Sequence, residues 1–67
     1  MMVGDRVKFR RASKAWKYYG LEPDAKGCVV EVHRDAEARG GWRVDVRFPG
    51  TAEPERGIEI EELEVIP

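Results

Sequence analysis

Hydrophobic and polar residues alternate most regularly near the middle of the chain. Trp42, Val44, Val46 and Phe48 fall on one side of this stretch, and Arg43, Asp45 and Arg47 fall on the other. Successive side chains of a strand point to opposite faces of a sheet, so the pattern predicts a strand with one buried and one solvent-facing side. The preceding segment Gly27–His33 is apolar and β-branched, which is typical of a strand that is covered over much of both faces. The two segments predict an antiparallel hairpin.

Shorter apolar stretches predict three further strands. Val3–Phe9 forms the first, with a turn at Gly4–Asp5, and Ile58–Ile60 and Glu64–Ile66 form the last two. A tight turn over Glu61–Leu63 carries Leu63 inward. The expected buried residues are Val7, Phe9, Val30, Val32, Val44, Val46, Ile58, Ile60, Leu63 and Val65.

Two polar segments, Arg34–Gly41 and Pro49–Gly57, lack apolar residues that would pin them. We expect both to be mobile loops. The 17-residue stretch Arg10–Lys26 also interrupts the strand pattern. Within it, Ser13–Tyr19 is either one helical turn, with Ser13 as N-cap and Gly20 as terminator, or a plain loop. Loops of this length are uncommon in compact domains and are usually functional.

The length of 67 residues predicts one domain, residues 1–67, with a small core. Cys28 is the only cysteine, so no internal disulfide forms, which suits the cytoplasm. The first residues lack the apolar segment of a signal peptide, and no apolar run reaches the ~20 residues of a membrane span. We therefore expect a cytoplasmic protein that makes no membrane contact.

Five short, twisted strands favour an all-β barrel, because closure removes exposed sheet edges. The succession of Val3–Val7, Lys26–Val32 and Ile60–Ile66 resembles the Src-homology-3-like barrels of small bacterial proteins. Within it, Lys26–Val32 is similar to the KOW element of ribosomal and transcription-factor barrels. The resemblance implies a small five-stranded Src-homology-3-like barrel with a long first loop and a short helical turn before the last strand. The chain lacks the Ala-Leu-Tyr-Asp-Tyr stretch of the eukaryotic peptide-binding branch.

Catalytic and metal-binding chemistry finds little support. Cys28 and His33 are the only thiol and imidazole, and on a regular strand residues five positions apart point to opposite faces. Two such ligands are too few for a structural zinc. The glutamates between Glu53 and Glu64 lack the spacing of a calcium loop. We expect no enzyme activity, no metal, no cofactor and no small-molecule substrate.

Charge is divided along the chain. Residues 1–34 carry eight Lys/Arg and four Asp/Glu, whereas residues 35–67 carry four and nine. The division either marks a basic binding face or supplies cross-strand charge pairs.

The first loop interleaves cations with aromatic residues. The candidate site comprises Arg10, Arg11, Lys14, Trp16, Lys17, Tyr18 and Tyr19. Cations neutralise phosphates and aromatic faces stack on unpaired bases, so the loop suits single-stranded RNA or DNA. Alternatively, Trp16 and one tyrosine fold back as a lid over the barrel.

The sequence therefore predicts a non-catalytic binding module whose partner is nucleic acid or protein. The leading hypothesis is contact with single-stranded RNA or DNA through the first loop. The alternative is a protein–protein interaction module that uses an aromatic surface formed by Trp16, Tyr18, Tyr19 and Trp42.

Overall fold

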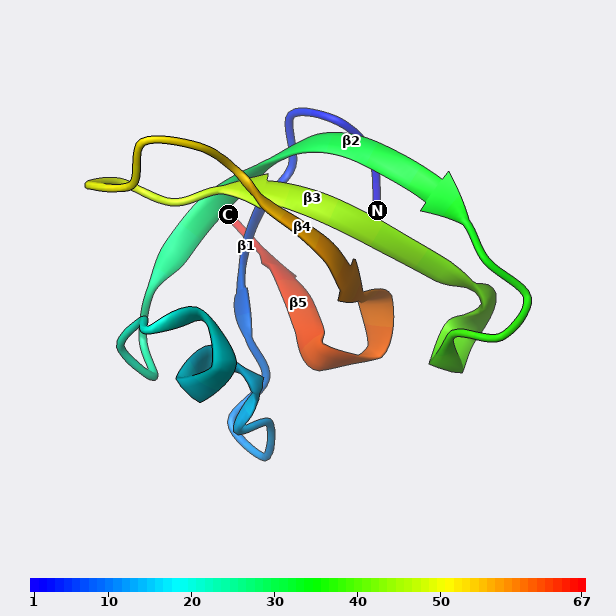
Figure 1. Cartoon of the computed structure of the whole chain (residues 1–67), viewed down its shortest axis with the longest axis horizontal. Coiled ribbons are helices and arrows are strands. Elements are labelled where there is room, and N and C mark those ends of the chain that lie inside the picture. Colours follow the sequence, from blue (N-terminus) through cyan, green and yellow to red (C-terminus); the bar gives the residue numbers. More distant parts are fainter.

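The fold consists of five strands in one antiparallel sheet. A computed structural model describes residues 1–67 and contains β1 (Arg6–Phe9), β2 (Lys26–Arg34), β3 (Trp42–Arg47), β4 (Glu55–Glu59) and β5 (Leu63–Ile66). Three short 3₁₀ segments complete it, η1 (Ala15–Tyr19), η2 (Arg39–Gly41) and η3 (Ile60–Glu62). The strand order is β4-β3-β2-β1-β5 (Figure 1). The all-β class, the five strands, the long first loop and the helical turn before the last strand are confirmed.

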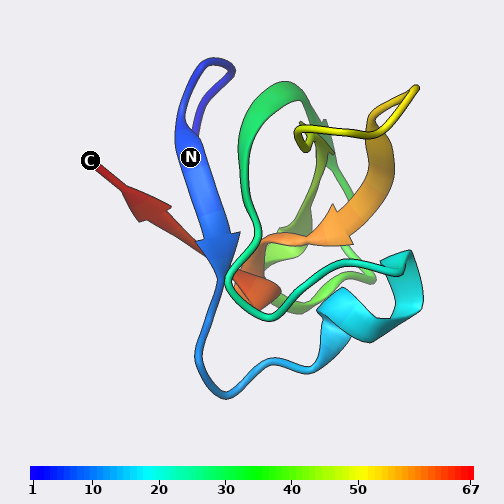
Figure 2. The ribbon, with the colours of Figure 1, turned by 90° about the vertical axis from the view of Figure 1, so that its left-hand side faces the viewer.

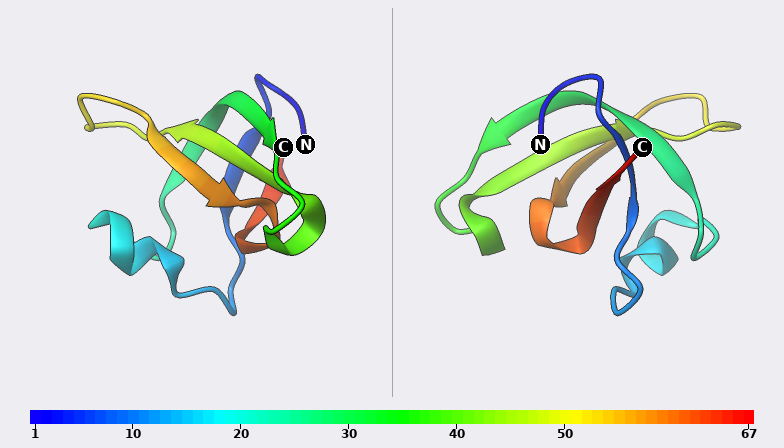
Figure 3. Two further views of the ribbon diagram at one scale, coloured as in Figure 1. Left: turned by 45° about the vertical axis from the view of Figure 1, so that its right-hand side comes forward. Right: turned by 180° about the vertical axis from the view of Figure 1, so that it is seen from behind.

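The sheet is strongly curved. β4 and β5 lie at opposite edges of the sheet, yet only the three residues of η3 connect them. A connection this short brings the two edges close together, so the sheet wraps around its own inner face, as the two views of Figure 3 show. β4 begins at Glu55 and not at Ile58, because Glu55 already pairs with Val46.

A β-bulge in β2 changes which residues face the core. Val29 pairs with Val46 but Glu31 pairs with Asp45, so β2 carries one extra residue, Val30. Because a one-residue insertion reverses the alternation beyond it, Val29 and Val32 share the inner face. The predicted burial of Val30 is wrong, and its side chain is 38% exposed.

A second bulge lies in β4. Val44 pairs with Ile58 and Val46 pairs with Glu55, which leaves one extra residue on β4. Gly57 adopts a positive φ of 73° there, a conformation that glycine accepts without strain. The backbone N–H of Gly57 donates to the carboxylate of Asp45 at 2.9 Å. Asp45 lies on the outer face, as the alternation predicts, but it is only 2% exposed, so its expected exposure to solvent is wrong.

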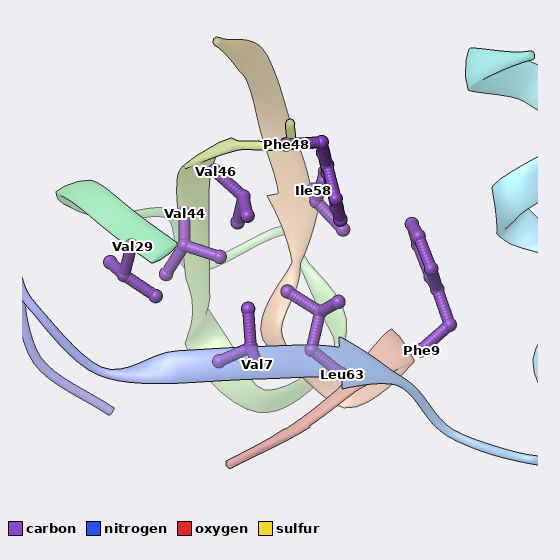
Figure 4. Packing of buried hydrophobic residues seen from close by; sticks show 8 residues of the cluster. All are labelled: Val7, Phe9, Val29, Val44, Val46, Phe48, Ile58 and Leu63. Atoms are coloured by element: carbon purple, nitrogen blue, oxygen red, sulfur yellow. The ribbon is translucent and has the colours of Figure 1, made fainter. Parts of the chain in front are cut away.

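The core lies on the inner face of the curved sheet. Its fully buried members are Val7, Phe9, Val29, Val44, Val46, Phe48, Ile58 and Leu63 (Figure 4). The rings of Phe9 and Phe48 stack with centroids 5.8 Å apart.

Six of the ten residues expected in the core are buried, Val7, Phe9, Val44, Val46, Ile58 and Leu63. Val32 and Ile60 are only partly buried. The expectation for Val65 is wrong, because this residue is 53% exposed. It pairs with the buried Val7, but β5 is an edge strand and no strand covers its other side.

Gly27 allows two strands to approach closely. A Cβ at this position would lie 2.6 Å from Val46 Cγ1 and 2.7 Å from the carbonyl oxygen of Arg47. No side chain fits here, so the close approach of the strands requires glycine at the second position of β2.

We expected no contacts to hold the connector Arg34–Gly41 in place, and this expectation is wrong. Ala38 in this connector is buried, and its N–H donates to the Asp35 carbonyl at 3.0 Å. The N–H of Arg39 donates to the Glu59 carboxylate at 2.7 Å. These contacts hold the connector against the β4–β5 junction. None of the helical segments has the length and apolar character needed to cross a membrane.

Candidate functional site

Two hydrogen-bonded turns shape the first loop. The Ser13 N–H donates to the Arg10 carbonyl at 2.9 Å and closes the first turn. The Ser13 hydroxyl accepts the N–H of Ala15 at 3.1 Å and contacts the Glu62 carboxylate, which ties the loop to η3. η1 then ends at Gly20 with a left-handed φ of 66°. Of the two alternatives, the helical turn is the correct one, and Gly20 terminates it as expected. The expected N-cap is wrong by one residue, because Lys14 occupies that position and Ser13 precedes it.

The three aromatic residues of η1 divide into two roles. Tyr19 stacks on Phe9 with ring centroids 6.3 Å apart, and burial raises the pKa of its phenol. Trp16 also packs against the core and is partly buried. Tyr18 is 90% exposed. Trp16 and Tyr19 therefore cover the core, and Tyr18 is the one of the three whose ring is exposed to solvent.

The cations of the first loop stay free of carboxylates. Arg10, Arg11, Lys14 and Lys17 are exposed, and none forms an ion pair. Lys17 Nζ lies 5.5 Å above the ring of Trp16. The nearby Glu62 is already engaged by Ser13 and Arg39. The structure thus brings Lys17 next to the covering aromatics and leaves the other three cations on the surface of the loop.

A second group of unpaired cations lies on the outer face of the sheet. Arg6 pairs with Cys28 across β1 and β2, and Cys28 pairs with Arg47 across β2 and β3. Directly opposed residues share a face, so these three form one row. With Lys26 they line a groove of about 600 Å³, which we call the basic groove. Its lining comes from β1, the start of β2 and the end of β3 with the turn after it. Figure 2 shows the course of these segments.

Sequence reasoning missed the basic groove. Arg6, Lys26 and Arg47 are about 20 residues apart from one to the next, and only the strand register brings them together. The only indication in the sequence was the division of charge along the chain. That division is explained equally well by a basic binding face and by cross-strand charge pairs.

The other end of the outer face holds a cluster of paired charges. His33 Nε2 lies 3.0 Å from Asp45 Oδ2, and Arg56 Nη1 lies 3.6 Å from the same oxygen. Arg43 donates to Asp35 at 2.8 Å and to the Gly57 carbonyl at 2.9 Å. We call these five residues the paired-charge cluster.

Hydrogen bonding sets the protonation of this cluster. The hydrogen bond with Asp45 raises the pKa of His33 above its ordinary value. Burial alone would raise the pKa of Asp45, but the hydrogen bonds from His33 and Gly57 outweigh it and lower the pKa. The bond from Arg43 lowers the pKa of Asp35. The carboxylates are therefore held in their charged forms.

Three residues here offer donors that could hold a metal ion. The ligand atoms of Glu31, His33 and Asp45 lie within 4.8 Å of one another. Asp45, however, already accepts from His33 and Gly57 and lies beside Arg56. A metal ion would have to break the hydrogen bond between His33 and Asp45 and compete with the Arg56 guanidinium for the Asp45 carboxylate. The arrangement therefore favours a structural role.

The bulge at Val30 also changes the relation between Cys28 and His33. Their partners on β3 are Arg47 and Arg43, which are on the same face. The two residues therefore share a face, unlike on a regular strand. Those partners are four positions apart along β3, a span of about 13 Å, which is too long for a nucleophile–base pair.

Trp42 lies apart from the η1 aromatics. It lines an apolar depression of about 260 Å³ with Met1, Val32 and Ile60. The guanidinium of Arg34 lies 5.6 Å from its ring centroid. None of the η1 aromatics lines this depression, so the four aromatics of the predicted interaction surface are divided between separate places.

Comparisons with known proteins add no assignment. No protein-family model matches the chain, and searches of curated proteins and of solved structures return no match.

Proposed function

We propose that this chain is a non-catalytic module that binds single-stranded RNA or DNA through the first loop. In the same proposal, the curved sheet is a Src-homology-3-like barrel with a KOW-like β2, and the protein acts in the cytoplasm without a cofactor. The short η3 connection between the two sheet edges supports the barrel. The lone free cysteine suits a reducing compartment.

One observation carries the proposal. Of the eight Lys/Arg in residues 1–34, only Lys8 has a carboxylate partner, Glu64. Of the four in residues 35–67, only Arg47 lacks one, because Arg39, Arg43 and Arg56 are ion-paired. The cations of the first half are therefore available to an external anion. This supports a basic binding face over the cross-strand pairing that was the other explanation of the charge division.

In this proposal, different residues of the first loop contact phosphates and bases. Arg10, Arg11, Lys14 and Lys17 supply positive charge to phosphates, and the exposed ring of Tyr18 supplies a stacking surface for a base. Trp16 and Tyr19 keep the loop folded against the core. A flat, sequence-tolerant contact of this kind is suited to unpaired nucleotides.

The test is a fluorescence anisotropy titration of labelled single-stranded oligonucleotides at two salt concentrations. Arg10→Ala, Arg11→Ala and Lys14→Ala should each weaken binding to all sequences and reduce the salt slope by about 1. Tyr18→Ala should weaken binding by about 1–3 kcal/mol and leave the salt slope unchanged. Arg56→Ala, which removes a charge from the paired-charge cluster, is the control and should leave affinity nearly unchanged.

The alternative is a protein-interaction module. Exposed apolar side chains outside the first loop, Trp42 and Val65 among them, favour that alternative. Absence of oligonucleotide binding by the wild type at low salt would refute the nucleic-acid proposal and favour a protein partner.

A further inference from the structure

The basic groove has the composition of an anion site. Its lining contains Arg6, Lys26 and Arg47 together with Gly27, Cys28 and the segment Phe48–Thr51, and no carboxylate is among them. None of the three cations is ion-paired. The Arg6 guanidinium donates one hydrogen bond of 3.2 Å, to the main-chain oxygen of Pro67.

The neighbouring charges do not neutralise the groove. Lys26 stands opposite Lys8, and the ammonium of Lys8 is 3.5 Å from Glu64. Like charges directly opposed on a sheet destabilise it. A bound anion would relieve this repulsion, whereas Asp35 and Asp45 are bound within the paired-charge cluster at the other end of the outer face.

The strand register sets the spacing of the cations. Arg6 and Arg47 lie on either side of Cys28, two strand spacings apart, so about 10 Å across the sheet separates their backbones. Long, exposed side chains across this span can contact more than one phosphate. A single small anion would meet only part of such a row, so the spacing favours a chain of phosphates.

The groove also leads toward the first loop. A second depression shares Lys26, Phe48 and Pro49 with it and extends to Gly20 and Leu21, directly after η1. Glu22 and Asp24 also line that depression. The apolar lining at Phe48 and Pro49 thus connects the cations of the sheet with the end of the loop that carries Tyr18.

We infer that the basic groove binds backbone phosphates of the same nucleic-acid strand whose bases meet Tyr18. The inference rests on the proposed function and adds a second phosphate contact, formed by Arg6, Lys26 and Arg47. Because phosphates carry no sequence information, this contact would add affinity and orientation to the strand without selecting a sequence.

Cys28 allows a direct test, since it is the only cysteine and lines the groove. The rate of its alkylation by iodoacetamide, a neutral reagent, would be measured without ligand, with oligothymidylate and with tripolyphosphate. Oligothymidylate should slow alkylation several-fold, and added salt should restore the rate. Tripolyphosphate distinguishes a free phosphate chain from a nucleic-acid backbone.

Matched variants complete the test. Arg47→Gln in the groove and Arg34→Gln at the far end of β2 each remove one exposed guanidinium without an ion pair from the β2–β3 hairpin. Arg47→Gln should weaken oligonucleotide binding, lower the salt slope by about 1 and abolish part of the protection, whereas Arg34→Gln should change none of these. Lys26→Gln is a second groove variant that removes a like-charge contact and keeps the fold.

The outcomes separate the two proposals. The oligonucleotide could bind without protecting Cys28, and Arg47→Gln and Lys26→Gln could bind it as tightly as Arg34→Gln. That result would overturn the groove inference and leave the proposed function standing. Protection by tripolyphosphate without any oligonucleotide binding would overturn the nucleic-acid source and the proposed function, and would support a site for free phosphate chains. The inference would be supported if the oligonucleotide protects Cys28 from alkylation and if both groove variants weaken this protection.

Discussion

The two ends of the outer face use charge in opposite ways. In the paired-charge cluster, Asp45 is buried and accepts hydrogen bonds from His33 and Gly57, and Arg43 bonds to Asp35. In the basic groove, Arg6, Lys26 and Arg47 lack carboxylate partners. Both ends lie on the same sheet, so regular strand pairing does not by itself explain why the charges are paired at one end and unpaired at the other.

The bulges account for the paired end. At Val30 and near Gly57, an extra residue shifts the register, so that the Gly57 N–H and the His33 imidazole both point to Asp45. Buried carboxylates need such partners to remain charged. The regular register around Cys28 lines up cations without partners. The comparison teaches that the paired charges hold the fold together, and that the unpaired charges are free for a ligand.

The largest expected difference is in stability. Asp45→Ala leaves the N–H of Gly57 without its partner and should lower the free energy of unfolding by about 1–3 kcal/mol. Arg47→Ala should change it by less than about 0.5 kcal/mol, since exposed, unpaired side chains contribute little. Urea unfolding of both variants measures the difference. Equal losses would show that the basic groove is as structural as the paired-charge cluster.

The aromatic residues of the first loop sharpen the comparison. Trp16→Ala should lower the free energy of unfolding by about 1–2 kcal/mol, below the range for fully buried tryptophan because Trp16 is only partly buried. Tyr18→Ala should leave stability unchanged. Thermal unfolding of the two variants provides the measurement, and a stable Trp16→Ala variant would mean that Trp16 does not cover the core.

A charge reversal in the basic groove should stabilise the free protein. Lys26→Glu replaces a like-charge contact with Lys8 by an attractive one and should raise the free energy of unfolding by about 0.2–1 kcal/mol. The same variant should bind oligonucleotides more weakly than the wild type. Loss of stability in Lys26→Glu would contradict the view that the groove carries unrelieved repulsion.

The smallest effect concerns pH, because the His33 side chain is 43% exposed. The hydrogen bond with Asp45 raises its pKa above the unfolded value of about 6.5. Its stabilisation is therefore complete below that pH and is lost as pH rises through the raised pKa. The destabilisation caused by His33→Gln should be larger at about pH 6, below the reference pKa, than at about pH 8.5, well above it. A larger effect at the higher pH would contradict this assignment.

The sequence predicted those parts of the fold that depend on local alternation. Val7 with Phe9, and Val44 with Val46, are buried as the two-residue period requires. The errors at Val30 and Asp45 come from bulges, whose positions depend on hydrogen bonds with other strands. Local sequence does not reveal such bonds.

The candidate site was only partly predictable for the same reason. Arg10–Tyr19 is a continuous segment, so its mixture of cations and aromatics was visible in the sequence. The separate roles of Tyr18 and Tyr19 depend on which ring packs on Phe9, and the basic groove depends on strand register. Tertiary contacts decide both.

The central claim is that a ligand meets the unpaired cations of the first loop and the basic groove, and not the paired ones. A titration of isotope-labelled protein with a single-stranded oligonucleotide, followed by the amide chemical shifts of every residue, tests it most directly. The account predicts salt-sensitive shifts over the first loop and the basic groove, with Tyr18 and Lys26 among them, and little change at Asp35 and Asp45. Shifts concentrated around His33, Asp45 and Arg56 would contradict it.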